Sequence, residues 1–122
     1  MLRPLDQYRS KAIQARKALG EVRLVTTDEV LTEVLDGLAR RGSGLREAAA
    51  QAIRGILEDP GVAVHPQSRE SFLAGLSLYE QRSDKGYSLV DCESMITMRR
   101  QGIADVRTND YHFAQEGFRV LI

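Results

Sequence analysis

The chain has 122 residues, of which 43% are hydrophobic and 28% are charged, and its formal net charge is zero. This composition excludes general disorder and leaves room for one domain, expected to span residues 1–122. A single cysteine excludes an internal disulfide framework and a Cys-rich zinc site. The sequence has no apolar run near the roughly 20 residues that span a bilayer, and its start lacks the apolar stretch of a secretory signal. We therefore expect a cytoplasmic protein.

The charges are unevenly distributed along the chain. Residues 1–20 carry five basic side chains and one acidic one, whereas residues 21–98 carry eight basic and thirteen acidic ones. A zero net charge argues against a broad polycationic surface for duplex DNA. An acidic middle between basic ends suits either a salt-bridged fold or a metal site flanked by phosphate contacts.

Apolar periodicity and turn residues divide the chain into alternating helices and short strands. Residues 5–19 predict a helix that stops at Gly20, and residues 22–25 predict a strand. Thr26 and Glu29 fit a capping box that opens the next helix. The remaining predicted elements are helix 45–57, strand 62–64, helix 68–81, helix 91–101, strand 105–108, a helical turn over 111–115 and strand 118–121. This order favours a three-layer α/β/α fold around a short, mostly parallel sheet.

Three acidic residues stand where such a fold gathers side chains, at the carboxyl ends of its strands. Glu33 lies in the helix after strand 22–25, Asp91 opens helix 91–101, and Asp110 follows strand 105–108. Converging carboxylates need a counter-charge, and Mg²⁺ or Mn²⁺ supplies it because these ions take oxygen ligands and substrate phosphates. A metal held in this way can activate water for attack on a phosphodiester.

Each of these acids also has a purely structural explanation. Glu33 lies roughly opposite the apolar stripe of its helix and could be a solvated surface residue. Asp91 follows Ser88 by three positions, which is a local capping pattern. Asp110 could cap the last short helix. The spacing alone leaves both explanations open for all three acids.

Other candidate groups have weaker patterns. His65 and His112 are far apart in sequence without zinc-ligand spacing, and we expect His112 to be structural or a minor contact rather than a catalytic base. Cys92 is expected to be a small buried hydrophobe. The sequence has no nucleophile elbow, phosphate-binding loop or dinucleotide fingerprint. Arg99 and Arg107 are among the basic residues that could contact phosphates.

Several segments, with the same order and spacing, resemble the PIN domain family, which includes the ribonuclease domains of VapC-type toxins. Residues 86–95 (Gly-Tyr-Ser-Leu-Val-Asp-Cys-Glu-Ser-Met) are similar to the family motif Ser-Leu-x-Asp-Cys-x-Ser. Residues 107–113 (Arg-Thr-Asn-Asp-Tyr-His-Phe) resemble its Thr-x-Asp-x-His-Phe motif. Residues 24–35 resemble its Thr-Ser-x-x-Val-Leu-x-Glu-x-Leu segment, and residues 115–121 resemble its ending. The resemblance covers roughly residues 5–122.

The resemblance implies an endoribonuclease that cleaves single-stranded RNA with Mg²⁺ or Mn²⁺. It also implies an antitoxin protein as a candidate binding partner. The carboxylates of the family fall on Glu33, Asp91 and Asp110, which would hold the metal and position the attacking water. The substrate-binding candidates are Thr108, Asn109, Arg107 and Arg99.

The sequence departs from the family at its start. PIN domains begin with a strand that carries an Asp and with a first helix, whereas residues 5–8 here already resemble the segment after that helix. Three explanations stay open: a true start upstream of Met1, a sheet that closes without the strand with help from a dimer, or a truncated relative that has lost catalysis. The alternative function is a non-catalytic module for homo-oligomerisation or for binding protein or RNA.

Overall fold

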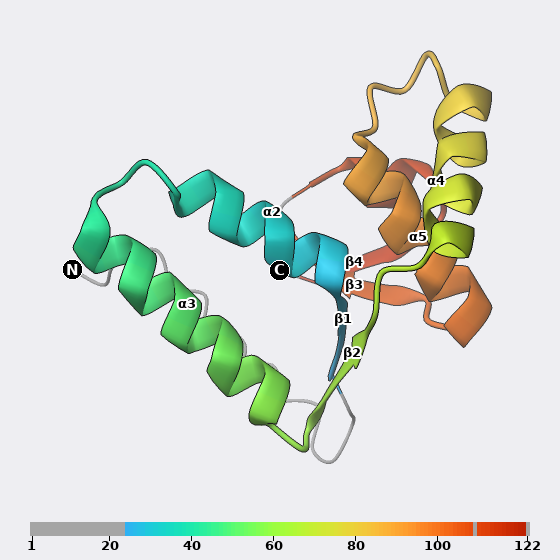
Figure 1. The fold of residues 1–122 in the computed structure, drawn as a ribbon. Helices are drawn as coiled ribbons and strands as arrows, with labels where there is room; N and C mark the ends of the chain where they lie inside the picture. The colour runs from blue at the N-terminus through green and yellow to red at the C-terminus, as the bar shows by residue number, and fades with distance from the viewer. Residues whose placement is uncertain (1–23, 109, 122) are drawn as a thin grey trace. The chain divides into compact units, whose positions relative to one another are not determined.

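The computed structural model describes residues 24–108 and 110–121, and the chain divides into two compact units, Met1–Pro66 and Gln67–Ile122 (Figure 1). The predicted helix 5–19 and the start of the predicted strand 22–25 lie outside the described residues.

In the N-terminal unit, two parallel strands are joined by two helices. The elements are β1 (Leu24–Thr27), α2 (Asp28–Leu38), α3 (Ser43–Glu58) and β2 (Val62–His65). The register runs from Leu24 opposite Val62 to Thr27 opposite His65. Parallel strands need a long crossover, and Figure 1 shows that α2 and α3 supply it. Two helices in this crossover agree with the order that the sequence predicts.

The start of α2 differs from the predicted capping box. Thr27, not Thr26, is the N-cap, and its hydroxyl accepts a hydrogen bond from the Val30 N–H at 3.2 Å. The box prediction is wrong because β1 continues through Thr27, which pairs with His65 and so moves the helix start by one residue. Glu29 is buried instead of capping, and this burial raises the pKa of its carboxyl.

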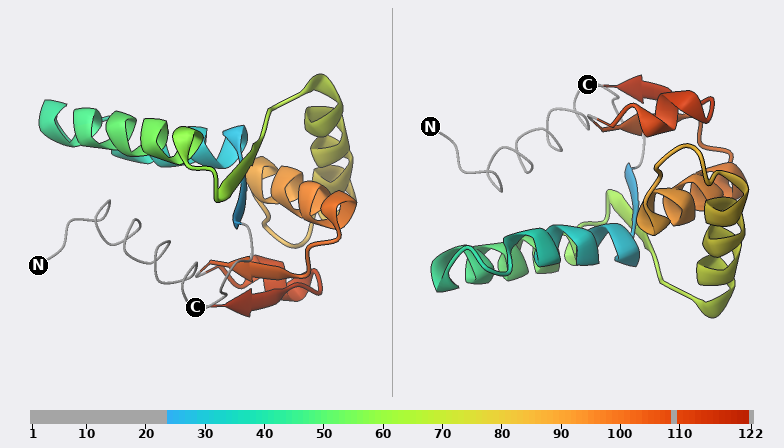
Figure 2. Two further views of the ribbon diagram at one scale, coloured as in Figure 1. Left: turned by 90° about the horizontal axis from the view of Figure 1, so that it is seen from below. Right: turned by 90° about the horizontal axis from the view of Figure 1, so that it is seen from above.

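In the C-terminal unit, two packed helices precede a second pair of parallel strands. The elements are α4 (Arg69–Gln81), α5 (Leu89–Gln101), β3 (Asp105–Arg107), α6 (His112–Gln115) and β4 (Arg119–Leu121). β3 pairs with β4 from Asp105 opposite Arg119 to Arg107 opposite Leu121, and α6 lies in the crossover between them. Both views in Figure 2 show α4 beside α5.

The core of the C-terminal unit lies under α5. Cys92 and Met95 are fully buried, as predicted for Cys92. The other buried members of this core are Leu78, Tyr87, Met98, Phe113 and Phe118. These residues come from α4, α5, α6 and the segments before α5 and β4. Their packing therefore holds the start of α5 and the start of α6 in fixed positions relative to each other.

Parallel strands with helical crossovers in both units confirm the predicted α/β class. Among the described residues the strands form two separate pairs, not one continuous sheet. No helix in the described part of the chain is long and apolar enough to cross a membrane.

Candidate metal centre

Asp91 is positioned by the first turn of α5. Ser88 is the N-cap, and its hydroxyl accepts a hydrogen bond from the Asp91 N–H at 3.0 Å. Oδ2 of Asp91 accepts one from the Ser88 N–H at 3.1 Å, which completes a capping box. The capping role expected as the structural explanation is therefore real. It also holds the Asp91 carboxylate in one orientation.

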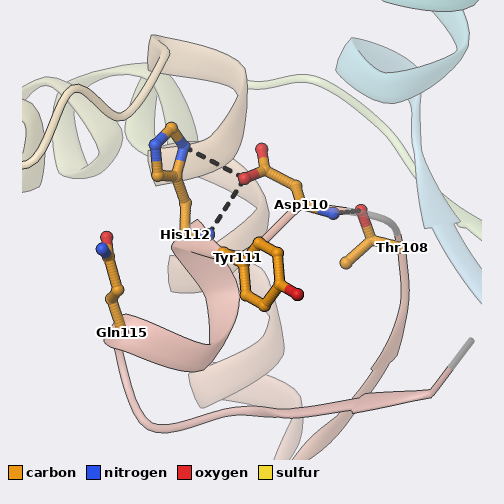
Figure 3. Close-up of a pocket in the computed structure, with 5 residues that line it drawn as sticks. All are labelled: Thr108, Asp110, Tyr111, His112 and Gln115. Atoms are coloured by element: carbon orange, nitrogen blue, oxygen red, sulfur yellow. Dashed lines mark hydrogen bonds and ion pairs between the residues drawn. The ribbon is translucent and has the colours of Figure 1, made fainter.

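Asp110 is positioned by the turn between β3 and α6. Its N–H donates to Oγ1 of Thr108 at 3.1 Å, and its Oδ1 accepts from the His112 N–H at 2.9 Å. Side-chain to backbone bonds two residues apart are the local turns that Asp and Thr favour. The backbone around Asp110 is thus fixed on both sides, and Figure 3 shows its carboxylate pointing toward the imidazole of His112.

His112 joins the two carboxylates. Its Nδ1 lies 3.4 Å from Oδ2 of Asp91 and 3.2 Å from Oδ1 of Asp110. One ligand atom from each of the three residues lies within 4.8 Å of the other two, so the group could hold a metal ion. The side chains of Asp91, Asp110 and His112 are 15%, 38% and 32% exposed, which leaves the cluster accessible from solvent.

The structural roles of the two acids leave oxygens available for a cation. The hydrogen bonds and ion pairs within the described part of the chain use Oδ2 of Asp91 and Oδ1 of Asp110. The second oxygen of each carboxylate has no hydrogen-bond partner among those residues. Asp91 caps α5, whereas the N-cap of α6 is Tyr111, so the predicted capping role of Asp110 is wrong and its carboxylate forms an Asx-type turn instead. Both local roles are compatible with metal binding.

An open hollow adjoins the cluster. Its lining residues are Thr108, Asp110, Tyr111, His112 and Gln115 (Figure 3). Tyr111 is 82% exposed, so a large aromatic ring is presented to solvent directly beside the acidic cluster. Sequence reasoning did not single out Tyr111. Its position between Asp110 and His112 was the available signal.

A second cluster of charges centres on Glu116, whose side chain is 5% exposed. It is connected to the site through Tyr87, whose ring packs on His112. Its Oε1 accepts hydrogen bonds from Nε of Arg82 and from the Tyr87 hydroxyl, and its Oε2 accepts one from Arg99 at 2.7 Å. Burial alone would raise the pKa of Glu116, but the hydrogen bonds and charges of the two arginines outweigh it and lower the pKa. This carboxylate is therefore ionised at neutral pH.

The other predicted site residues lie in different places. Glu33 is on α2 in the N-terminal unit with an exposed side chain, and its participation in the site stays a prediction. Arg107 is exposed at the end of β3, and Asn109 lies outside the described residues. Arg99 is engaged with Glu116 and lies over the Phe118 ring, 5.3 Å from its centroid. A substrate contact for Arg99 stays a prediction.

His112 is predicted from the sequence to be structural or a minor contact, and the structure places its Nδ1 beside both acids, so its role in the site stays a prediction. The spacing of Asp110 and His112 in the sequence indicates this contact, because an Asp side chain can accept a hydrogen bond from the N–H two residues later in an Asx-type turn. The approach of Asp91, which is 21 residues away from His112, depends on the tertiary fold.

Comparisons with known proteins identify the family of this chain. The PIN domain family matches residues 5–118. The crystal structure of VapC20 from Mycobacterium tuberculosis, a Sarcin-Ricin loop cleaving toxin, superimposes with a TM-score of 0.74 at 25% identity, covering 90% of this chain and 82% of that one. The comparison with curated proteins found no match. With a family match over most of its length and the paired acids in the expected elements, this chain belongs to the PIN domain family.

Proposed function

We propose that this chain is a metal-dependent endoribonuclease that cleaves single-stranded RNA. The observation that carries the proposal is the meeting of Asp91 and Asp110, two acids from separate elements, beside an open hollow. Membership of the PIN domain family supports a nuclease, and the similar VapC20 is a Sarcin-Ricin loop cleaving toxin. An antitoxin protein as partner, self-association and a cytoplasmic location belong to the same proposal.

The donor set fits a divalent cation. Two carboxylates and one imidazole offer atoms within 4.8 Å of one another, and each carboxylate retains an oxygen without a partner in the described residues. Carboxylate oxygens suit Mg²⁺ and Mn²⁺. Asp91, Asp110 and His112 would hold the ion. A bound ion of this kind lowers the pKa of water and neutralises charge on a phosphodiester.

The protein contributes fixed positions for these donors. The capping box holds Asp91, and the Thr108 and His112 bonds hold Asp110, so neither carboxylate must reorganise when a cation or a phosphate arrives. This preorganisation matters because a displacement of about 1 Å can cost a hundredfold in rate.

The hollow offers contacts for an RNA strand. The exposed ring of Tyr111 can stack against an unpaired base, an interaction that accepts any base and that duplex RNA does not offer. Thr108 lines the same hollow, and Arg107 and Asn109 adjoin it in sequence and can meet the backbone phosphates. These contacts favour single strands and loops over duplexes.

The test is a cleavage assay on fluorescent RNAs with Mn²⁺, with Mg²⁺ and with chelator. The panel contains single strands, the same sequences as duplexes, and an RNA with the Sarcin-Ricin loop. Asp91→Asn should abolish cleavage, whereas Asp105→Asn, at an exposed acid on β3 paired with Arg119, should leave it unchanged. A folded wild-type chain that cleaves none of these RNAs would overturn the proposal and favour a non-catalytic binding module.

A further inference from the structure

The imidazole of His112 needs a neighbour to fix its orientation. His112 is the first residue of α6, which has only four residues, and its side chain is 32% exposed. The terminal torsion of a histidine is broad and roughly two-fold, so a short helix does not by itself decide which ring edge faces the carboxylates. Yet Nδ1 faces both Asp91 and Asp110, at 3.4 and 3.2 Å.

The neighbour is Tyr87, which is 4% exposed. Its ring centroid lies 5.1 Å from that of His112 with an interplanar angle of 57°, a tilted aromatic arrangement. Tyr87 directly precedes Ser88, the N-cap that orients Asp91. The same short segment therefore contacts the imidazole and orients one of the carboxylates that the imidazole faces.

Tyr87 is itself held at its far end. Its hydroxyl donates to Oε1 of Glu116 at 3.2 Å, and Arg82 and Arg99 hold that carboxylate from two sides. Burial, and then the charge of Glu116, raise the pKa of Tyr87, so the phenol keeps its proton and continues to donate. The tyrosine ring is thus fixed both by the core and by an ionised carboxylate.

We propose that Tyr87 is a positioning residue whose ring holds the His112 imidazole with Nδ1 facing Asp91 and Asp110. The Glu116–Arg82–Arg99 cluster acts through Tyr87 and keeps its ring in place. The functional meaning rests on the proposed function, because the His112 orientation matters for activity only if the cluster holds a metal. The orientation itself can be measured without metal or RNA.

The experiment uses protein labelled with ¹⁵N at its two histidines, His65 and His112, and reads the ring-nitrogen shifts at about pH 8.5. Without metal, the wild type should show His112 as one dominant tautomer with Nδ1 protonated, because carboxylates only accept hydrogen bonds. A cation bound through Nδ1 would displace this proton. Tyr87→Leu should move both His112 signals toward the tautomer average and weaken Mn²⁺ binding about tenfold. Tyr87→Phe, which keeps the ring, should restore the shifts and bring Mn²⁺ affinity to within about twofold of wild type. His65 is the internal reference.

Phe118→Leu is the matched control, since Phe118 is a buried aromatic of the same core with no ring contact to His112. It should lower thermal stability and leave the His112 signals in place. The proposal is overturned if Tyr87→Leu leaves those signals unchanged or if Phe118→Leu moves them equally. If Tyr87→Leu does not fold, the wild-type protein is tested for a nuclear Overhauser effect between the Tyr87 and His112 rings. Its presence supports the ring contact, and its absence overturns the proposal.

Failure of the proposed function gives a different result. A wild-type chain that binds no Mn²⁺ and cleaves no RNA, but whose His112 signals still respond to Tyr87→Leu, overturns the nuclease and supports the positioning contact. A wild-type chain that cleaves RNA while Tyr87→Leu moves neither the signals nor the rate overturns the positioning role alone.

Discussion

Nδ1 of His112 lies 3.4 Å from Oδ2 of Asp91, although the two residues are 21 positions apart in the chain. The contact joins the start of α5 to the start of α6. The same Asp91 oxygen also accepts the Ser88 N–H, so a helix cap and a candidate ligand group share one atom. The site is therefore assembled where two helix starts meet, with Asp91 held by a capping box and Asp110 by a turn bond to the His112 N–H.

Asp110→Asn should weaken Mn²⁺ binding by at least about tenfold, which corresponds to about 1.4 kcal/mol, because an amide oxygen carries no net charge to offset the cation. Stability should change by less than about 1 kcal/mol, since the Asn oxygen can still accept the His112 N–H in the same turn. Isothermal titration with Mn²⁺ and urea unfolding measure the two effects. An equal affinity of variant and wild type for Mn²⁺ would show that Asp110 is not a metal ligand.

Tyr111→Ala should raise the KM for single-stranded RNA about tenfold and leave kcat within about twofold, because a stacked base contributes roughly 1–3 kcal/mol of binding. Tyr111 is 82% exposed, so the substitution should not disturb the core. Tyr79→Ala, at an exposed tyrosine on α4, is the control and should leave KM unchanged. Steady-state cleavage kinetics decide, and an unchanged KM in Tyr111→Ala contradicts the stacking role.

Glu116→Gln should lower the free energy of unfolding by about 2 kcal/mol at neutral pH, because it removes the charge behind the hydrogen bonds from Arg82 and Arg99. This figure is at the lower end for charged hydrogen bonds because the two arginines are partly exposed and solvent screens them. Urea unfolding measures it. Glu70→Gln, at an exposed acid that pairs with Arg100, should cost little and serves as the control.

The stability contribution of Glu116 should also depend on pH. Its pKa in the folded state lies below the ordinary value of 4.5, so the folded protein binds fewer protons than the unfolded chain in that range. The stability advantage of wild type over Glu116→Gln should therefore be complete above pH 4.5 and disappear as the pH falls through the lowered pKa. An advantage that grows on acidification would contradict the ion-pair network.

Gly75→Ala should destabilise the protein by about 1–3 kcal/mol, although alanine is the better helix former. A Cβ at position 75 would lie 2.5 Å from Cγ and 3.2 Å from Cα of Glu93, because α4 approaches α5 closely there. Gly55→Ala is the matched control, since a Cβ at this position, in the last turn of α3, would meet nothing within 4 Å. That substitution should stabilise the protein by up to about 1 kcal/mol. Thermal unfolding of both variants checks the contrast.

Local patterns predicted most elements of this chain but not all of their boundaries. Ser68 and Ser88 each cap a helix with a capping box, and both predicted helices are present. The second begins at Leu89, so Asp91 is its third residue and not its first. Thr26 fits the same pattern but does not cap α2, because β1 pairs with β2 as far as Thr27 and strand pairing overrides the local preference. Strand pairing thus moves this boundary by one residue, and the predicted starts of α3 and α5 are each two residues late, at positions 45 and 91 instead of Ser43 and Leu89.

The sequence by itself determined the α/β class and the family, and it named Asp91 and Asp110 as candidate site residues, because these depend on periodicity and on short motifs whose residues are close along the chain. Only the tertiary structure decided that His112 faces both acids, that Tyr87 packs on its ring and that Glu116 holds Tyr87. Those contacts join segments brought together by burial of the α5 core. Side-chain packing between distant segments has no periodic signature, so it cannot be read from residue spacing.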